Sequence, residues 1–105
     1  MPVIASTQLR LRLLSGATHA LRLEVEQPQR APTGEWRCIV RIVGLHDKLA
    51  PIAGEDSLQS LTLALGLLRR RLEAQVQKGA RLLQPNEDED FPLEGYFTHR
   101  EGRAV

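Results

Sequence analysis

The sequence is poor in the residues from which cross-linked, membrane-spanning or base-stacking proteins are built. Among its 105 residues, Cys38 is the single cysteine and 4% are aromatic. A single cysteine excludes an intrachain disulfide framework and a zinc site made of cysteine pairs. No apolar run approaches the roughly 20 residues that cross a bilayer, and the N-terminus lacks the basic and apolar stretches of a secretory signal. We therefore expect a cytoplasmic protein that makes no membrane contact.

An excess of one charge is also missing. The chain has 14 Lys+Arg residues against 13 Asp+Glu residues, for a net charge of +1. Binding of polyanions by bulk basicity requires clustered Lys and Arg, and binding of single-stranded nucleic acid also requires aromatic side chains for stacking. We therefore expect no nucleic-acid partner. The first half of the chain is net positive and the second half net negative.

The first half of the chain alternates apolar and polar residues. Leu9 and Leu11 flank Arg10, and Leu21 and Leu23 flank Arg22. A period of two places the apolar side chains on one face of a sheet. The predicted strands are residues 4–14, 20–27 and 36–43. A possible fourth strand at residues 48–53 would be an edge strand, because its proline cannot donate a hydrogen bond to a neighbouring strand.

A long helix is predicted over residues 56–78. Asp56 is a typical N-cap, Gln59 follows at the capping-box spacing, and Gly79 stands where a left-handed C-cap is expected. One apolar stripe is predicted to face the sheet and comprises Leu58, Leu61, Leu65, Leu68, Leu72 and Val76. A second apolar patch lies nearly opposite and comprises Leu63, Leu67 and Ala74. A helix on a sheet is normally polar there, so either the C-terminal segment or a second copy of the protein is expected to cover this patch.

The remaining residues, 80–105, are predicted to form an acidic C-terminal segment whose end is disordered. We expect residues 1–105 to form a single domain, since the chain is too short for two independent cores. The predicted fold class is α+β. It consists of an antiparallel sheet of three to four strands, one long α-helix packed on one face, and a C-terminal extension wrapped around the sheet edge.

Few residues are suited to catalysis. Cys38 lies on the inward phase of a strand and is expected to be a buried apolar residue rather than an exposed thiolate. No glycine-rich phosphate loop and no metal-ligand spacing occurs, so neither a cofactor nor a metal site is predicted. An enzyme would require His46, Asp47 and Glu55 to converge near the start of the helix. The sequence favours a non-enzymatic protein.

The outward side of the predicted sheet is rich in arginine. Its charged residues are Arg10, Arg12, Arg22, Arg37 and Arg41, with Glu24 and Glu26. Two interpretations stay open at this point. The face could bind an acidic protein surface, or it could be a solvated face that carries cross-strand ion pairs.

Two short patterns resemble a known family. The first is W-x-C at Trp36–Cys38, followed by Gly44; the second is G-x-D-S-x-Q-[AS]-L-x-L-A-L at residues 54–65, where Ser60 departs from the more frequent alanine. They resemble a family of small, uncharacterised bacterial proteins, a domain of unknown function. The resemblance implies a compact antiparallel sheet crossed by a helix, and no established activity. Small proteins of this kind are often encoded beside secreted toxins, which they neutralise, although a fold alone supplies no function.

These observations favour a protein-binding module, in its most specific form an immunity-type protein that neutralises a cognate toxin. Its candidate binding residues are Glu87, Asp88, Glu89, Asp90, Phe91, Glu94 and Tyr96. The carboxylates would enter a basic cleft of the partner, and the two aromatic residues would act as apolar anchors. The alternative is a homodimeric structural or assembly subunit joined through Leu63, Leu67 and Ala74.

Overall fold

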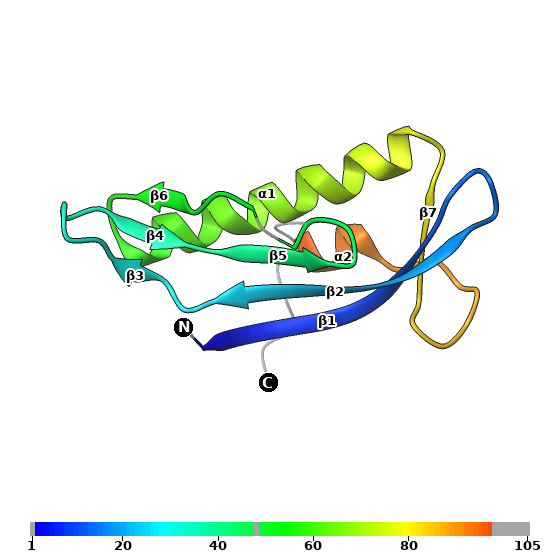
Figure 1. Ribbon diagram of the computed structural model, residues 1–105, viewed down its shortest axis with the longest axis horizontal. Coiled ribbons are helices and arrows are strands. Elements are labelled where there is room, and N and C mark those ends of the chain that lie inside the picture. The colour runs from blue at the N-terminus through cyan, green and yellow to red at the C-terminus, as the bar shows by residue number, and fades with distance from the viewer. Residues whose placement is uncertain (1, 48, 98–105) are drawn as a thin grey trace.

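The computed structural model describes residues 2–47 and 49–97. The described chain is α+β, with a four-stranded and a three-stranded antiparallel sheet and one long helix (Figure 1). The predicted class and the antiparallel pairing are therefore confirmed, although the strands divide into two sheets rather than one.

The four-stranded sheet has the order β5-β2-β1-β7. Its strands are β1 (Val3–Arg12), β2 (Thr18–Glu26), β5 (Val40–Val43) and β7 (Arg81–Leu83). The three-stranded sheet has the order β3-β4-β6, with β3 (Gln29–Arg30), β4 (Trp36–Cys38) and β6 (Ile52–Gly54). The strand β6 lies at an edge, as the nearby proline predicted.

The strand predicted over residues 36–43 is interrupted at Ile39. The part before the interruption, β4, pairs with β3 and β6, whereas the part after it, β5, pairs with β2. The backbone N–H of Glu26 donates to the carbonyl of Ile39 at 2.9 Å, at the point where the chain passes from one sheet to the other. Periodicity alone does not reveal this change of partner, because both parts keep the same alternation.

The long helix α1 (Ser57–Gln77) begins and ends within one residue of the predicted bounds. The Asp56 carboxylate accepts from the Gln59 backbone N–H at 2.7 Å, and the Gln59 side chain accepts from the Glu55 backbone N–H at 2.8 Å. At the other end, Gly79 has a φ of +94°, and its N–H donates to the Val76 carbonyl at 2.9 Å. These caps satisfy backbone groups that the helix itself leaves unpaired.

The buried face of α1 differs from the predicted stripe. Leu68 and Leu72 are buried in the same cluster as the strand leucines, but Leu58 and Val76, at the two ends of the stripe, are exposed. Ser60 and Ala64 are fully buried instead.

At the start of the helix, the reason for this difference is a close backbone contact between β6 and α1 at Ser60. A Cβ atom added to Gly54 would lie 2.5 Å from the Ser60 backbone nitrogen, so the first turns of the helix rest directly on the strand. Only small side chains fit in such a contact. The buried Ser60 hydroxyl is satisfied because it donates to the Ser57 carbonyl at 3.0 Å.

The C-terminal segment contains two elements that the sequence did not predict, β7 and the short helix α2 (Leu93–Phe97). Leu93 and Phe97 are partly buried against the core, and an Arg69 side-chain N–H donates to the Phe97 carbonyl at 3.2 Å. Figure 1 shows α2 in the space between α1 and the sheet. The predicted disorder at the end of the chain falls on residues 98–105, outside the described residues.

The contact between β6 and α1 gives a testable prediction. We expect Gly54→Ala to lower the free energy of unfolding by about 1–3 kcal/mol, since the new methyl group overpacks a backbone contact. Gly66→Ala is the matched control, because a Cβ there meets only an Arg70 guanidinium nitrogen, at 3.4 Å. It should raise the free energy of unfolding by up to about 1 kcal/mol through helix propensity. Urea unfolding of both variants measures the difference, and equal effects would contradict the proposed contact.

Candidate functional site

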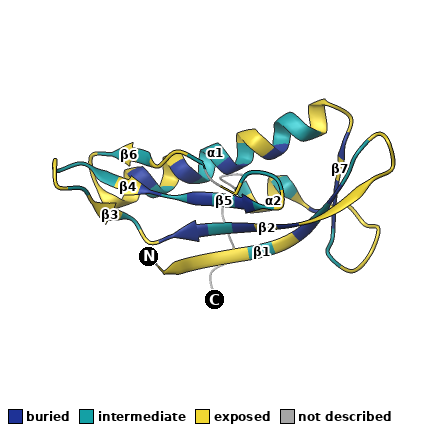
Figure 2. Cartoon of the chain, viewed as in Figure 1, coloured by how far each residue is buried: buried dark blue, intermediate teal, exposed yellow. Residues whose placement is uncertain are grey.

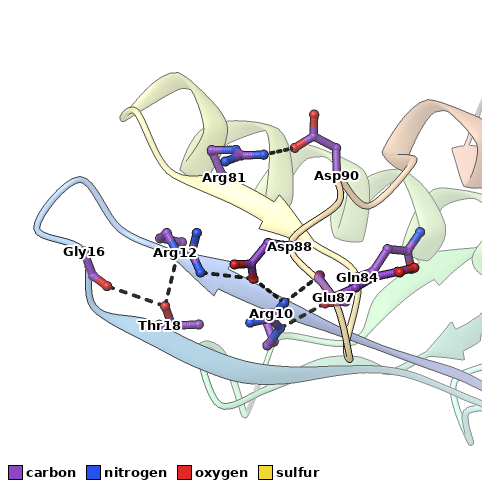
Figure 3. Close-up of polar contacts among 9 residues, drawn as sticks. All are labelled: Arg10, Arg12, Gly16, Thr18, Arg81, Gln84, Glu87, Asp88 and Asp90. Carbon is purple, nitrogen blue, oxygen red and sulfur yellow. Dashed lines mark hydrogen bonds and ion pairs between the residues drawn. The ribbon is translucent and has the colours of Figure 1, made fainter.

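The acidic run lies on a loop that folds back onto β1. Asp88 sits between two arginines of that strand (Figure 3). Its Oδ1 atom is 2.9 Å from Nη2 of Arg10 and 3.2 Å from Nη2 of Arg12. The hydrogen bond from Arg10 and the charge of Arg12 lower the pKa of the Asp88 carboxyl below its ordinary value. This carboxylate is therefore engaged by the protein's own cations.

The backbone of the same loop is also held in place. Arg10 donates through Nε to the Gln84 carbonyl at 3.0 Å and through Nη2 to the Glu87 carbonyl at 2.6 Å. The Gln84 N–H donates to the Glu89 carbonyl at 2.8 Å. A single arginine thus holds two backbone carbonyls of the loop, at Gln84 and Glu87, against β1.

The other predicted binding residues fall into different environments. Asp90 forms an ion pair with Arg81 at 2.7 Å, on a different side of the loop from Asp88 (Figure 3). Glu87, Glu89 and Glu94 are exposed. The acidic run is therefore not a uniform patch of available charge, since two of its four carboxylates are paired within the chain.

The two aromatic residues expected as anchors are stacked on each other. The rings of Phe91 and Tyr96 have centroids 4.7 Å apart and an interplanar angle of 18°. Phe91 is 5% exposed and belongs to the core cluster, whereas Tyr96 is 55% exposed. In this arrangement Phe91 is a core residue rather than a surface anchor, and Tyr96 is the ring that a partner could contact.

The predicted dimer face of α1 is only partly exposed. Leu63 is 47% exposed, but Leu67 and Ala74 are half-buried, and Leu67 packs against the core. These three residues therefore do not form a broad apolar surface. The stripe of α1 that remains open to a second molecule is narrow.

Every arginine predicted on the outer sheet face has a carboxylate partner. Besides the pairs with Asp88, the ion pairs are Arg22–Glu24, Arg37–Glu35, Arg41–Glu24 and Arg41–Glu26. Arg41 lies directly opposite Glu24 on the neighbouring strand, which is the cross-strand arrangement expected of a solvated face. The pair with Glu26 compensates a carboxylate that is otherwise buried.

The residues considered for catalysis have structural contacts. Cys38 is buried, and burial followed by the charge of Glu26 raises the pKa of its thiol. Asp47 accepts from the Gly44 backbone N–H at 2.9 Å, and His46 exchanges backbone hydrogen bonds with Ile42. Within residues 2–47 and 49–97, no three His, Cys, Asp or Glu side chains gather as a metal site requires.

A feature that the sequence did not reveal is the incomplete pairing of β1. On one side β2 pairs with β1 along its length, but on the other side β7 pairs only with Arg10, Leu11 and Arg12. No described residue pairs with Val3–Gln8 on that side, and we call this segment the free edge. Figure 2 shows most of it as exposed.

The backbone groups that point out of the free edge follow from the ladder. Leu13 donates to the Ala17 carbonyl at 2.8 Å, and hydrogen-bonded pairs alternate along an antiparallel ladder. From Ala5 onward, odd-numbered residues of β1 therefore bond to β2, and even-numbered residues face the other side; a shift of register between Val3 and Ala5 interrupts this alternation nearer the N-terminus. Arg10 and Arg12 meet β7 there, whereas the N–H and C=O groups of Ser6 and Gln8 have no strand beside them among the described residues.

A shallow apolar groove of about 220 Å³ adjoins the free edge. Its lining includes Ala5 and Thr7 of β1 together with Leu65 of α1 and Phe97 of α2. Tyr96 lies at the same groove. The free edge thus combines unpaired backbone groups with an apolar channel for alternate side chains, which is the arrangement that binds an extended peptide in strand addition.

Residues 7–93 match the family model described as Domain of unknown function (DUF6968). The chain belongs to this family. The matched range extends from the middle of β1 to the start of α2, so it includes both sheets and the long helix of this DUF6968 member. Comparison with curated proteins and with solved structures gave no match. No helix in the described part of this family member has the length and apolarity needed to cross a bilayer.

The ion pairs of Asp88 give a prediction about pH. Because the pKa is lowered in the folded protein, the contribution of Asp88 to the loop is complete above its ordinary pKa of 3.8 and is lost as the pH falls through the lower folded value. In an NMR titration of the carboxyl group we expect a midpoint below 3.8, and Arg10→Gln should move that midpoint upward. Glu87→Gln is the control, since it keeps the backbone carbonyl that Arg10 contacts. An unchanged midpoint in Arg10→Gln would contradict this assignment.

Proposed function

We propose that this protein is a non-enzymatic protein-binding module that takes up an extended polypeptide strand along the free edge of β1. The observation that carries the proposal is the pairing of β1, which β7 covers only at Arg10–Arg12. Unpaired backbone N–H and C=O groups form a template on which another strand can pair. Hydrogen bonds to that strand then replace hydrogen bonds to water. The groove beside Ala5 and Thr7 would receive apolar side chains of the incoming strand.

The electrostatics of the molecule agree with a backbone-mediated contact. The outer-face arginines are paired within the chain, as are Asp88 and Asp90. A partner that used these particular side chains would have to compete with the ion pairs they already form. The free edge carries no charged residue, so a strand can add there without displacing an existing ion pair.

The immunity-type form of this proposal, in which the partner is a toxin and the protein is bacterial and cytoplasmic, is supported by the resemblance of residues 36–65. Its expected contact through Asp88 and Asp90 has less support, because both carboxylates are neutralised within the chain. We therefore place the proposed contact at the free edge rather than at the acidic loop. Tyr96, beside the groove, remains part of the proposed surface.

The test is affinity capture from the lysate of the native host, with three versions of the tagged full-length protein. Ser6→Pro removes an N–H that faces the free side and leaves the ladder with β2 intact. Leu63→Glu alters the exposed helix face instead. We expect a stoichiometric protein, which includes any untagged copy of this chain, to be retained by wild type and Leu63→Glu and to fall roughly tenfold in Ser6→Pro.

The controls decide which surface is responsible. Circular dichroism and urea unfolding establish that Ser6→Pro is folded; if it is not, the double variant Ser6→Lys, Gln8→Lys replaces it, since both side chains are exposed. Equal capture by all three proteins, or no captured protein, would overturn the proposed function. Loss of capture in Leu63→Glu alone would favour the alternative contact through the helix.

A further inference from the structure

We propose that the strand received by the free edge is the free edge of a second copy, so that two molecules join through antiparallel β1–β1 pairing into one continuous eight-stranded sheet. This inference rests on the proposed function and names its partner. The two-fold axis would pass near Ser6, which places Ser6 and Gln8 of each copy along the shared ladder. The sheet order on each side would then be β5-β2-β1, with β7 beyond the contact.

The other sheet edges are protected within the described chain, which singles out this one. The far side of β7 is occupied by the loop, where the Phe91 N–H donates to the Leu82 carbonyl at 2.9 Å. The far side of β5 exchanges hydrogen bonds between Ile42 and His46. The strand β3 is two residues long, and β6 rests on α1 at Gly54. Edges are commonly protected by such coverings, by short length or by bulges. In β1 a shift of register lies between Val3 and Ala5, and no described residue pairs with the regular stretch 5–8 on its free side.

The free edges of two copies can also pair with each other without conflict in hydrogen bonding or charge. An antiparallel strand paired about a two-fold axis presents the same outward N–H and C=O groups on both copies, so one contact satisfies both molecules. The segment Val3–Gln8 contains no charged residue, so self-pairing places no like charges opposite each other. The nearest arginines, Arg10 and Arg12, both form ion pairs with Asp88, which compensates part of their charge.

Exposed apolar side chains occur both on the free edge and at the groove beside it. Val3 is 44% exposed, Ile4 is 52% exposed, and Tyr96 at the groove is 55% exposed. Two-fold pairing would shield those of these side chains that meet the second copy, which adds apolar burial to the backbone hydrogen bonds. A second copy therefore fits the edge in hydrogen bonding, in charge and in apolar character.

The experiment uses sedimentation velocity of the purified full-length protein at tens of micromolar, with two charge variants. One is Ser6→Lys, Gln8→Lys and the other is Ser6→Glu, Gln8→Glu. All four side chains lie on exposed positions that do not contact the core. We expect wild type to be a dimer and each variant alone to associate at least roughly tenfold more weakly, because like charges then meet across the ladder. An equimolar mixture should form a heterodimer, since opposite charges then face each other.

A cross-link provides an independent measurement. Residues opposite each other in an antiparallel ladder have Cα atoms about 4.5–5.5 Å apart, within the range that a disulfide bridges. Ser6→Cys should therefore form an interchain disulfide under mild oxidation. The exposed turn variant Ser15→Cys should not, and the native Cys38 is buried and does not compete.

The outcomes separate this inference from the function on which it rests. A monomeric wild type, charge variants that dimerise as strongly as wild type, or a mixture that stays monomeric would each overturn self-pairing. If the purified protein is a monomer but capture from lysate still depends on Ser6, the binding function stands and the partner is a different polypeptide. If neither dimerisation nor capture depends on the free edge, both proposals fail.

Discussion

The unequal pairing of β1 is the constraint on which the arrangement of this protein depends. Backbone N–H and C=O groups in a strand require partners, and a ten-residue strand presents two rows of them. The β2 strand satisfies one row along its length, whereas β7 is three residues long and satisfies only the end of the other. Within the described chain, the same strand is thus internal at Arg10–Arg12 and an edge at Val3–Gln8. Both the position of the C-terminal segment and the proposed binding surface follow from this difference.

The charged residues of β1 lie in the half of the strand that β7 covers. Arg10 and Arg12 hold Asp88, and Arg10 also holds the loop backbone, so the loop stays beside the short strand that it follows. The acidic run was predicted from the sequence to bind a partner, but its Asp88 instead holds the loop to β1 through ion pairs within the chain. The free half of β1 has no corresponding arginine and no charge at all, so the binding proposed for it would use backbone hydrogen bonds and apolar contacts.

Much of the fold could be predicted because its signals are local. The helix bounds follow from Asp56, Gln59 and Gly79, each of which acts within one helical turn of its own position. Alternation of leucines similarly predicted β1 and β2, and the inward phase predicted the burial of Cys38. The buried face of α1 was predicted less well, because the small residue Ser60 is buried through a contact with Gly54 on β6, which is not visible in the sequence of the helix.

The candidate site could be predicted only in part. The sequence by itself determined the long helix, the strands β1 and β2 with their apolar faces, and the scarcity of catalytic groups, since these depend on neighbours along the chain. Only the tertiary structure decided that Asp88 is neutralised, that Phe91 is buried and that half of β1 lacks a partner among the described residues. The physical reason is distance along the chain: Arg10 and Asp88 are 78 residues apart, and a three-residue strand leaves no periodic signal to predict where it will pair.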